Sequence, residues 1–234
     1  CGSSLCMSAP DSWERLGAEQ MALVPQRRRL LLLGLGGCLF SGQADWLATH
    51  TPDQESAEAL QSKLKEKFGK RIDGMHTSPV QSYYWADGDV RHQQEVRTLL
   101  DSDVPFSELR SFVEAEHPYT MPMIISAAHG GNIIAKRDAL ERYLMGSVDI
   151  NQTTAEEVKL IGAELVQIRY VACSHVEPAE DKKDTHRLTV KTTSKSRTHI
   201  IREFGGLEFE WTPVQGNRPF IQWLEQAVQT SSEL

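Results

Sequence analysis

Two stretches rich in β-forming residues flank an Asp-Gly dipeptide in the first half of the chain. Residues 81–90 read QSYYWADGDV, with Asp87 and Gly88 near the centre. Both residues tolerate the positive φ angles that a two-residue turn requires. The pattern therefore predicts a β-hairpin, with one strand on each side of the turn.

Apolar residues at helical spacing predict two helices around this hairpin. The first covers Gln54–Phe68, with Thr51 as the capping residue before it and Gly69 placed to end it. The second covers Phe106–Glu116. It stops at His117, because the residue before a proline is disfavoured in the α region.

Shorter apolar stretches complete the predicted element order of this region. Residues 45–50 and 123–126 read as strands, and residues 135–144 read as a short final helix. The resulting order is strand, helix, strand, strand, helix, strand. This βαββαβ order predicts an α+β fold of the ferredoxin-like type.

Several motifs in this region carry a family resemblance. They are SYYW at residues 82–85 with Gly88, HPY at 117–119 with Pro122, the strand at 123–126, and TPDQESAEAL at 51–60. Together they resemble the CutA divalent-cation tolerance proteins over residues 45–145. The resemblance implies a ferredoxin-like sandwich and a role in tolerance to copper and other divalent cations.

The remaining residues, 146–234, present the same kinds of element again. The helix predicted at 155–170 begins with a capping box of Thr154 and Glu157. Residues 165–178 and 187–193 resemble further parts of the same family, although SYYW and HPY have no counterpart here. We interpret this half as a second, eroded tandem copy of the ferredoxin-like domain, and the alternative is an unrelated α/β subdomain.

Composition and charge narrow the class of protein. The 234 residues are 40% hydrophobic and 24% charged, which is typical of a globular protein. The formal net charge is −7. An acidic chain argues against nucleic acid as the main partner, because phosphate binding requires a basic face.

The segment 1–44 is predicted to be an N-terminal extension that carries a targeting signal. Three arginines at residues 27–29 precede an apolar run at residues 30–40, followed by the small residues Gly42 and Ala44. This layout predicts export or delivery to an organelle such as the thylakoid lumen. The apolar run is shorter than the ~20 residues of a stable membrane span. The alternatives are a buried first strand with a basic flank and a cytoplasmic protein.

Three residues are candidate metal ligands. The resemblance implies binding through Cys and His side chains, and His117 in the HPY motif is the first position to carry over. Cys173 and His175 lie two apart on a predicted strand and therefore face the same side. Imidazole suits copper and zinc, and thiolate suits cuprous copper. The alternative is a buried structural Cys and a His that closes a helix.

The sequence offers no support for an enzyme. It contains no Gly-x-Ser-x-Gly, His-Glu-x-x-His or Cys-x-x-Cys motif. We therefore expect a metal-binding protein without catalytic activity. The competing hypothesis is a structural or regulatory scaffold that has lost metal binding.

The aromatic hairpin residues Tyr83, Tyr84 and Trp85 are predicted to pack across strands and between subunits. The resemblance implies trimers whose strands meet edge to edge, so we expect a homotrimer or a pseudo-hexameric assembly. The two predicted copies leave a second possibility, in which one copy covers the sheet edge of the other within one chain.

Overall fold

The computed structural model describes residues 45–127, 142–179 and 182–228. It contains both helices and strands, so the predicted α+β class is confirmed. The N-terminal extension and its targeting segment lie outside the described residues. Most of the helix predicted at 135–144 also lies outside them, but its final residues are wrong, because a strand already begins at Tyr143.

The elements follow the same order in the two halves of the described chain. The first half contains β1 (Asp45–Thr51), α2 (Gln54–Phe68), β2 (Ile72–Ala86), β3 (Asp89–Ser102), α3 (Phe106–Glu116) and β4 (Ile124–Ala127). The second half contains β5 (Tyr143–Asn151), α5 (Ala155–Gln167), β6 (Cys173–Pro178), β7 (Thr185–Thr193), α6 (Ser194–Glu203), β8 (Glu210–Gly216) and α7 (Arg218–Ala227).

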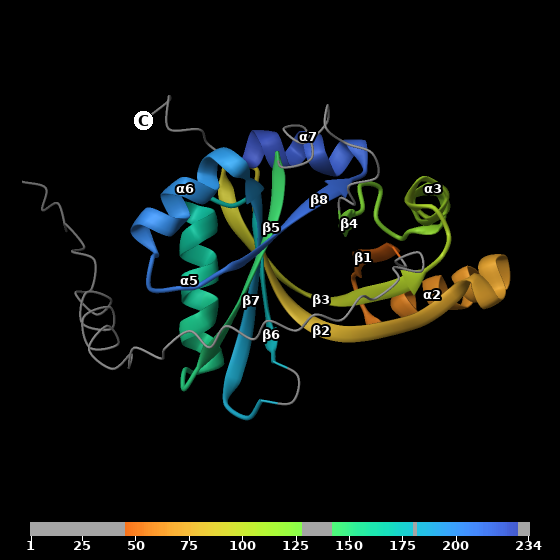
Figure 1. The fold of residues 1–234 in the computed structure, drawn as a ribbon, viewed down its shortest axis with the longest axis horizontal. Coiled ribbons are helices and arrows are strands. Elements are labelled where there is room, and N and C mark those ends of the chain that lie inside the picture. Colours follow the sequence, from red (N-terminus) through yellow and green to blue (C-terminus); the bar gives the residue numbers. More distant parts are fainter. Residues whose placement is uncertain (1–44, 128–141, 180–181, 229–234) are drawn as a thin grey trace, which may run out of the picture. The chain divides into compact units, whose positions relative to one another are not determined.

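All eight strands join in one closed antiparallel ring, in the order β1-β3-β2-β6-β7-β5-β8-β4 (Figure 1). Two seams join the halves. Residues 81–84 of β2 pair with residues 173–176 of β6, and β4 pairs with β8. This closure matches the second possibility considered from the sequence, because each half covers the sheet edges of the other within one chain.

Local sequence signals explain most element boundaries. Asp87 and Gly88 adopt positive φ angles of 55° and 81° and make the predicted hairpin turn. Helices α2 and α3 have the predicted bounds. The predicted cap Thr51 is wrong, because this residue belongs to β1. Asp53 caps α2 instead, and its carboxylate accepts a hydrogen bond from the backbone N–H of Ser56 at 2.7 Å.

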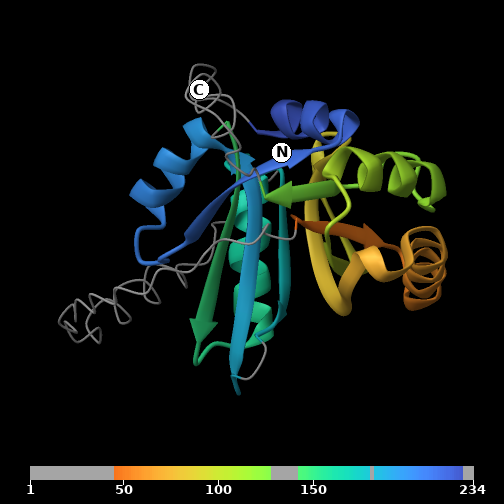
Figure 2. The same cartoon turned by 45° about the vertical axis from the view of Figure 1, so that its right-hand side comes forward.

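Four of the described helices cover the outside of the ring in two groups, whereas α7 packs against inward-facing residues such as Ala48 and Ile125. Helices α2 and α3 lie together beside the first-half strands, whereas α5 and α6 lie beside the second-half strands (Figures 1 and 2). The long β2–β3 hairpin reaches from the first group to the second. At its tip, Tyr83, Trp85 and Val90 pack against the apolar cluster that includes Val158 and Leu165 of α5.

The interior of the ring is unusually polar. Side chains alternate between the two faces of a strand, so every second residue of each strand points into the ring. Several of these inward residues are charged or titratable yet buried: His50, Glu95, His175, Glu177 and Lys191. A buried charge destabilises the fold unless it has a partner, and buried titratable groups are typical of functional sites, so this interior is the candidate functional site.

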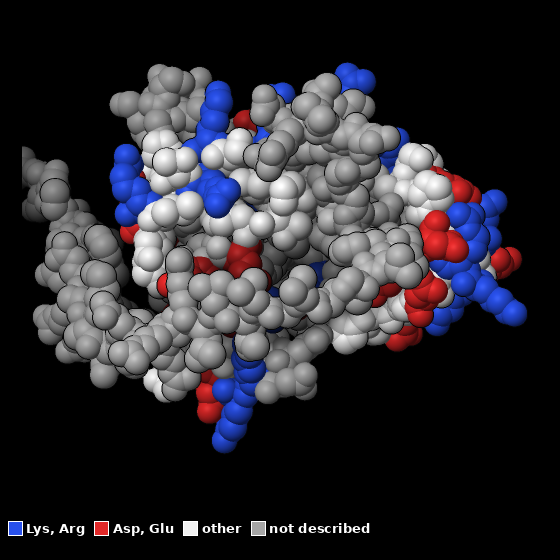
Figure 3. All heavy atoms as spheres, in the orientation of Figure 1, with Lys and Arg blue, Asp and Glu red and all other residues white. Residues whose placement is uncertain are grey.

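The outer surface carries charges of both signs. Lys and Arg side chains alternate with Asp and Glu side chains around the end of the molecule formed by α2 (Figure 3). Among the described residues, no helix has the length and apolar character needed to cross a membrane.

Candidate metal centre

Three buried residues from three strands bring possible metal-ligating atoms together inside the ring. His50 lies on β1, Glu95 on β3 and His175 on β6. One ligand atom from each lies within 4.8 Å of the other two. The site therefore combines two residues of the first half with one of the second.

Strand register explains why these side chains meet. His50 pairs with Arg97 across β1 and β3, which places Glu95 two residues further along the same inward face. Ser82 of β2 pairs with His175 of β6 at the seam between the halves. The hydroxyl of Ser82 donates to Glu95 at 2.5 Å, so the seam and the carboxylate are directly connected.

The carboxylate of Glu95 is held by hydrogen bonds on both oxygens. Oε2 accepts from Ser82 and from Nδ1 of His50 at 3.2 Å, whereas Oε1 accepts from Gln93 at 2.7 Å and from Tyr119 at 3.1 Å. Burial alone would raise the pKa of Glu95. The hydrogen bond and charge interaction with His50, with the bonds from Ser82 and Gln93, outweigh burial and lower the pKa to about 2.

The hydrogen bond between His50 and Glu95 leaves the other ring nitrogen of His50 without a partner. Because Nδ1–H donates to the ionised Glu95, Nε2 carries the lone pair, and it is buried without a hydrogen-bond partner. Burial lowers the pKa of His50 to about 4, so the ring is neutral at pH 7. A neutral histidine that donates its other N–H to a carboxylate has the usual arrangement of a metal ligand.

His175 presents its ring edge to His50 but also has a cationic neighbour. The two ring centroids lie 4.2 Å apart at an interplanar angle of 84°. Nζ of Lys191 lies 2.6 Å from Nδ1 of His175. Burial holds the pKa of His175 well below its ordinary value, and burial likewise lowers the pKa of Lys191 to about 8.

Of the three ligands predicted from sequence, only His175 lies in this cluster. His117 follows α3, and its Nδ1 accepts from the backbone N–H of Tyr119 at 3.0 Å. Its Nε2–H therefore donates to Oγ1 of Thr49 at 3.1 Å, and both ring nitrogens have protein partners. Cys173 is on the inward face with His175, where burial raises the pKa of its thiol to about 11.

The aromatic residues of the hairpin contact the neighbouring strand β3 and, through Trp85, the second half of the same chain. The ring of Tyr83 stacks on His92 with centroids 4.6 Å apart, and Tyr84 donates to Gln93 at 3.1 Å. The carbonyl of Trp85 accepts from Nε1 of Trp223 in α7 at 3.1 Å. These contacts lie within one chain, and the predicted contacts between subunits stay a prediction.

Sequence reasoning missed His50 and Glu95. The signal that could have found them is the inward alternation of β1 and β3, which places a histidine and a glutamate where apolar residues are expected. Alternation alone does not predict which strands become neighbours when they lie far apart in the chain, as His50 and Glu95 do at a separation of 45 residues. The missing information was the order of the strands in the ring.

Comparisons with known proteins find similarity in the first half of the chain. The family model described as CutA1 divalent ion tolerance protein matches residues 46–132. The divalent-cation tolerance protein CutA of Thermococcus kodakarensis is 32% identical over 77 residues, which are 32% of this chain and 72% of that protein.

Solved structures of similar proteins include CutA from Archaeoglobus fulgidus, described as periplasmic, and CutA1 from Oryza sativa. They are 25% and 22% identical to this chain, cover 38% of it and 87% and 84% of their own chains, and have a TM-score of 0.34. The chain belongs to the CutA divalent-cation tolerance protein family.

Proposed function

We propose that this chain binds one divalent cation, copper(II) or zinc(II), inside the ring through His50, Glu95 and His175. The observation that carries the proposal is that ligand atoms of these three buried residues lie within 4.8 Å of one another. Membership of a family of divalent-cation tolerance proteins supports a cation as the ligand.

The chemistry of the donors suits these ions. Two imidazole nitrogens and one carboxylate oxygen are typical of zinc and copper(II) sites, and three protein ligands leave a position for water or another ligand. Bonds of about 2.0–2.2 Å would place the donor atoms roughly 3–3.5 Å apart, so the side chains must rotate inward slightly. The buried Nε2 of His50 gains the partner that it lacks without a cation.

This ligand set revises the one expected from the sequence. It keeps His175 and replaces His117 and Cys173 by His50 and Glu95. A neutral buried thiol is a poor ligand for a divalent ion, and His117 would have to give up two hydrogen bonds to bind one. Copper, which the family resemblance suggested, is the first ion to test.

Tandem duplication is part of this proposal. Support comes from the strand orders of the two halves, β4-β1-β3-β2 and β8-β5-β7-β6, which place equivalent strands in equivalent positions. The seams β2–β6 and β4–β8 each join equivalent strands, as a pseudo-twofold arrangement requires. On this view each half is a ferredoxin-like copy, and the expected domains, residues 45–145 and 146–234, meet near the start of β5 at Tyr143.

Closure of the ring changes what self-association requires. Strands β2 and β4 would be the edge strands of a single copy, and here both pair with the second half. A homotrimer or larger assembly of this chain therefore has to use other surfaces. One candidate is residues 72–80 of β2, which pair with β3 but, among the described residues, with no second strand.

A second candidate function is a scaffold without a bound cation. The specific observation that favours it is Lys191, whose ammonium group lies next to His175. A buried positive charge beside a ligand opposes a cation by charge repulsion. Under this hypothesis the polar interior serves folding and assembly, and the chain binds no ion at physiological concentration.

The sequence of the N-terminal extension indicates the compartment in which we expect the protein to act. We retain the prediction that residues 1–44 carry a signal for an organelle lumen or for export, with the cytoplasm as the alternative. The support is the sequence of arginines, apolar residues and small residues described above.

The test is calorimetric titration of the full chain with copper(II) and zinc(II), on the wild type and on His50→Gln and His175→Gln. We expect one ion per wild-type chain and a loss of at least about tenfold in affinity in each variant. The matched control is His92→Gln, because His92 is exposed on the same strand as Glu95. Wild-type affinity in both site variants would exclude this site, and no binding to the wild type would favour the scaffold.

A further inference from the structure

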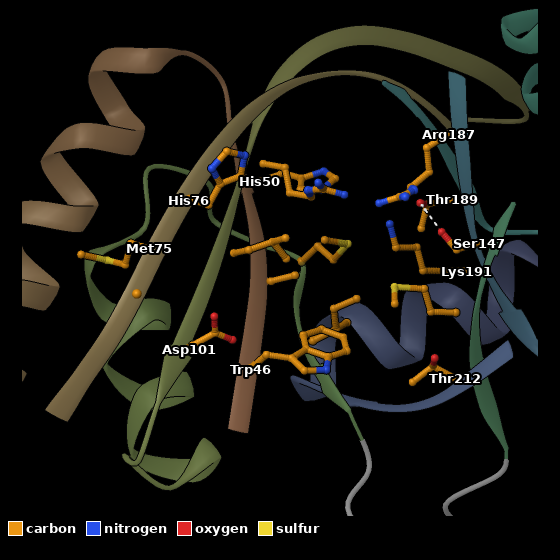
Figure 4. Close-up of a pocket in the computed structure, with 17 residues that line it drawn as sticks. Trp46, His50, Met75, His76, Asp101, Ser147, Arg187, Thr189, Lys191 and Thr212 are labelled. Carbon is orange, nitrogen blue, oxygen red and sulfur yellow. Dashed lines mark hydrogen bonds between the residues drawn. The ribbon is translucent and has the colours of Figure 1, made fainter. Parts of the chain in front are cut away.

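The interior of the ring contains a cavity much larger than a cation requires. Its volume is about 630 Å³, and residues of both halves line it. Cavities of roughly 300–1,000 Å³ are the usual size for small organic ligands. The exposed side chains of His76 and Asp101 are part of the lining, so the cavity has access to solvent (Figure 4).

One wall of the cavity carries cationic groups. Arg187 and Lys191 extend from β7 toward His50, and Arg97 of β3 also lines the cavity (Figure 4). Lys191 is only 2% exposed. Within the described parts of the chain, no carboxylate oxygen lies within 4.0 Å of its Nζ, and its close contact is the neutral His175.

Both arginines are held in place, and one nitrogen of Arg97 has no hydrogen-bond partner. Arg97 donates from Nη1 to Glu177 at 2.6 Å, while its Nε is buried without a hydrogen-bond partner. Arg187 is fixed by two bonds to Asp149, at 2.8 Å and 3.3 Å. The nearby carboxylate of Glu95 is already occupied by four hydrogen-bond donors. The cationic wall therefore has a buried donor, Nε of Arg97, that the protein does not satisfy.

The other wall is apolar. Trp46 lies on the far side of the cavity from Arg187 (Figure 4), and the apolar side chains of Leu99, Met123 and Ile125 from the first half also line the cavity. Methionine and tryptophan side chains adapt to flat or aliphatic ligand bodies. The acidic Asp101 lies at this end and would repel a second anionic group on the ligand.

From these two walls we propose that the cavity binds an organic anion with a single carboxylate or phosphate head group, in which the head contacts Lys191 and Arg97 and an apolar body lies against Trp46. The head group supplies the counter-charge that Lys191 lacks and accepts a bond from Nε of Arg97. The apolar body explains why the cavity is not lined by polar groups throughout. This site adjoins the proposed cation site, because His50 lines the cavity and Lys191 contacts His175, but it does not need a bound metal.

The test uses the full chain with a chelator present, so that it is independent of the cation site. The probes are naphthalene-2-carboxylate, 1-naphthyl phosphate, inorganic phosphate and the neutral naphthalene-2-methanol, each titrated by calorimetry. We expect at least one naphthyl anion to bind at least about tenfold more tightly than the neutral alcohol and than inorganic phosphate. The two anions distinguish a carboxylate head from a phosphate head.

The informative variant is Lys191→Met, with the exposed Lys63→Met as its control. We expect Lys191→Met to weaken binding of the preferred anion at least about tenfold and Lys63→Met to leave it unchanged. If Lys191→Met does not fold, methyl NMR of the wild type decides the location, because the anion should shift the signals of Met123 and Met145 but not that of the 53% exposed Met121. The proposal would be overturned if the neutral alcohol bound as tightly as the anions or if neither anion bound. It would also be overturned if Lys191→Met bound the anion like the wild type or if the methyl signals of Met123 and Met145 did not shift.

Discussion

The ammonium group of Lys191 lies 2.6 Å from Nδ1 of His175, inside a closed ring of eight strands. The two residues face each other across β6 and β7 of the second half. They connect the candidate cation site with the cationic wall of the cavity. The charge of Lys191 acts in opposite directions on the two ligands, since it repels a cation and attracts an anion.

Replacing Lys191 with methionine should therefore strengthen cation binding. Removal of one buried positive charge next to His175 should raise the affinity for copper(II) or zinc(II) by about tenfold or more. Competition with a chelator of known affinity measures the change. Lys63→Met on the exposed surface of α2 is the control. A weaker affinity in Lys191→Met would show that the amine orients or ligates instead of repelling.

Stability of the metal-free chain should fall as the pH falls from about 6.5 to 4. Burial lowers the pKa of His50 from 6.5 to about 4, so in this window the unfolded chain binds more protons than the folded chain. The shift corresponds to about 3 kcal/mol for this one residue. The buried His175 and the half-buried His117 have lowered pKa values and act in the same direction.

Urea unfolding at several pH values, with a chelator present, measures this dependence. His50→Gln should lose less stability between pH 6.5 and 4 than the wild type, whereas the exposed His92→Gln should follow the wild-type curve. Parallel curves for all three proteins would mean that His50 is not neutral and buried in the folded chain.

The ion pair between Arg97 and Glu177 should be important for holding the halves together. Arg97 of β3 and Glu177 of β6 are 14% and 6% exposed in their side chains, and the N–O distance is 2.6 Å. Glu177→Gln leaves a buried guanidinium without its counter-charge, which should cost about 3–5 kcal/mol in the free energy of unfolding.

The double variant Arg97→Met with Glu177→Met is the matched control for this pair. Apolar side chains of similar volume remove both charges together, so most of the lost stability should return. Denaturant unfolding of the three variants measures the coupling. A double variant that is as unstable as the sum of both single changes would show that the residues act independently.

Gly146 of β5 should not tolerate a side chain. A Cβ atom at this position would lie 2.6 Å from Cζ3 of Trp211, on the neighbouring strand β8. Gly146→Ala should therefore cost about 1–3 kcal/mol by forcing the indole to move. Gly206→Ala is the control, because no atom lies within 4 Å of its added Cβ. Thermal unfolding of both variants measures the difference, and equal midpoints would contradict the packing of Trp211.

Local sequence signals predicted the elements well where the interactions are themselves local. The bounds of α2 and α3 follow from apolar spacing together with Gly69 and His117, and the turn at Asp87 and Gly88 follows from their tolerance of positive φ. The cap of α2 was misplaced by two residues, because Thr51 and Asp53 are both good capping residues and only the course of β1 distinguishes them.

The metal centre was predictable only in part. The expectation that Cys173 and His175 share a face follows from strand periodicity and depends on no distant contact. His50 and Glu95 carry no motif, and their proximity to His175 depends on which strands become neighbours. Their significance could not be read from spacing along the chain.

The amino-acid sequence by itself determined the α+β class, the order of elements and the family, because these depend on residue periodicity, turn chemistry and motifs within short segments. The tertiary structure decided that the two halves close into one ring and that His50, Glu95, His175 and Lys191 meet inside it. The physical reason is that backbone pairing between strands is chemically uniform. The seams at β2–β6 and β4–β8 arise from the packing of whole halves and not from any local signal.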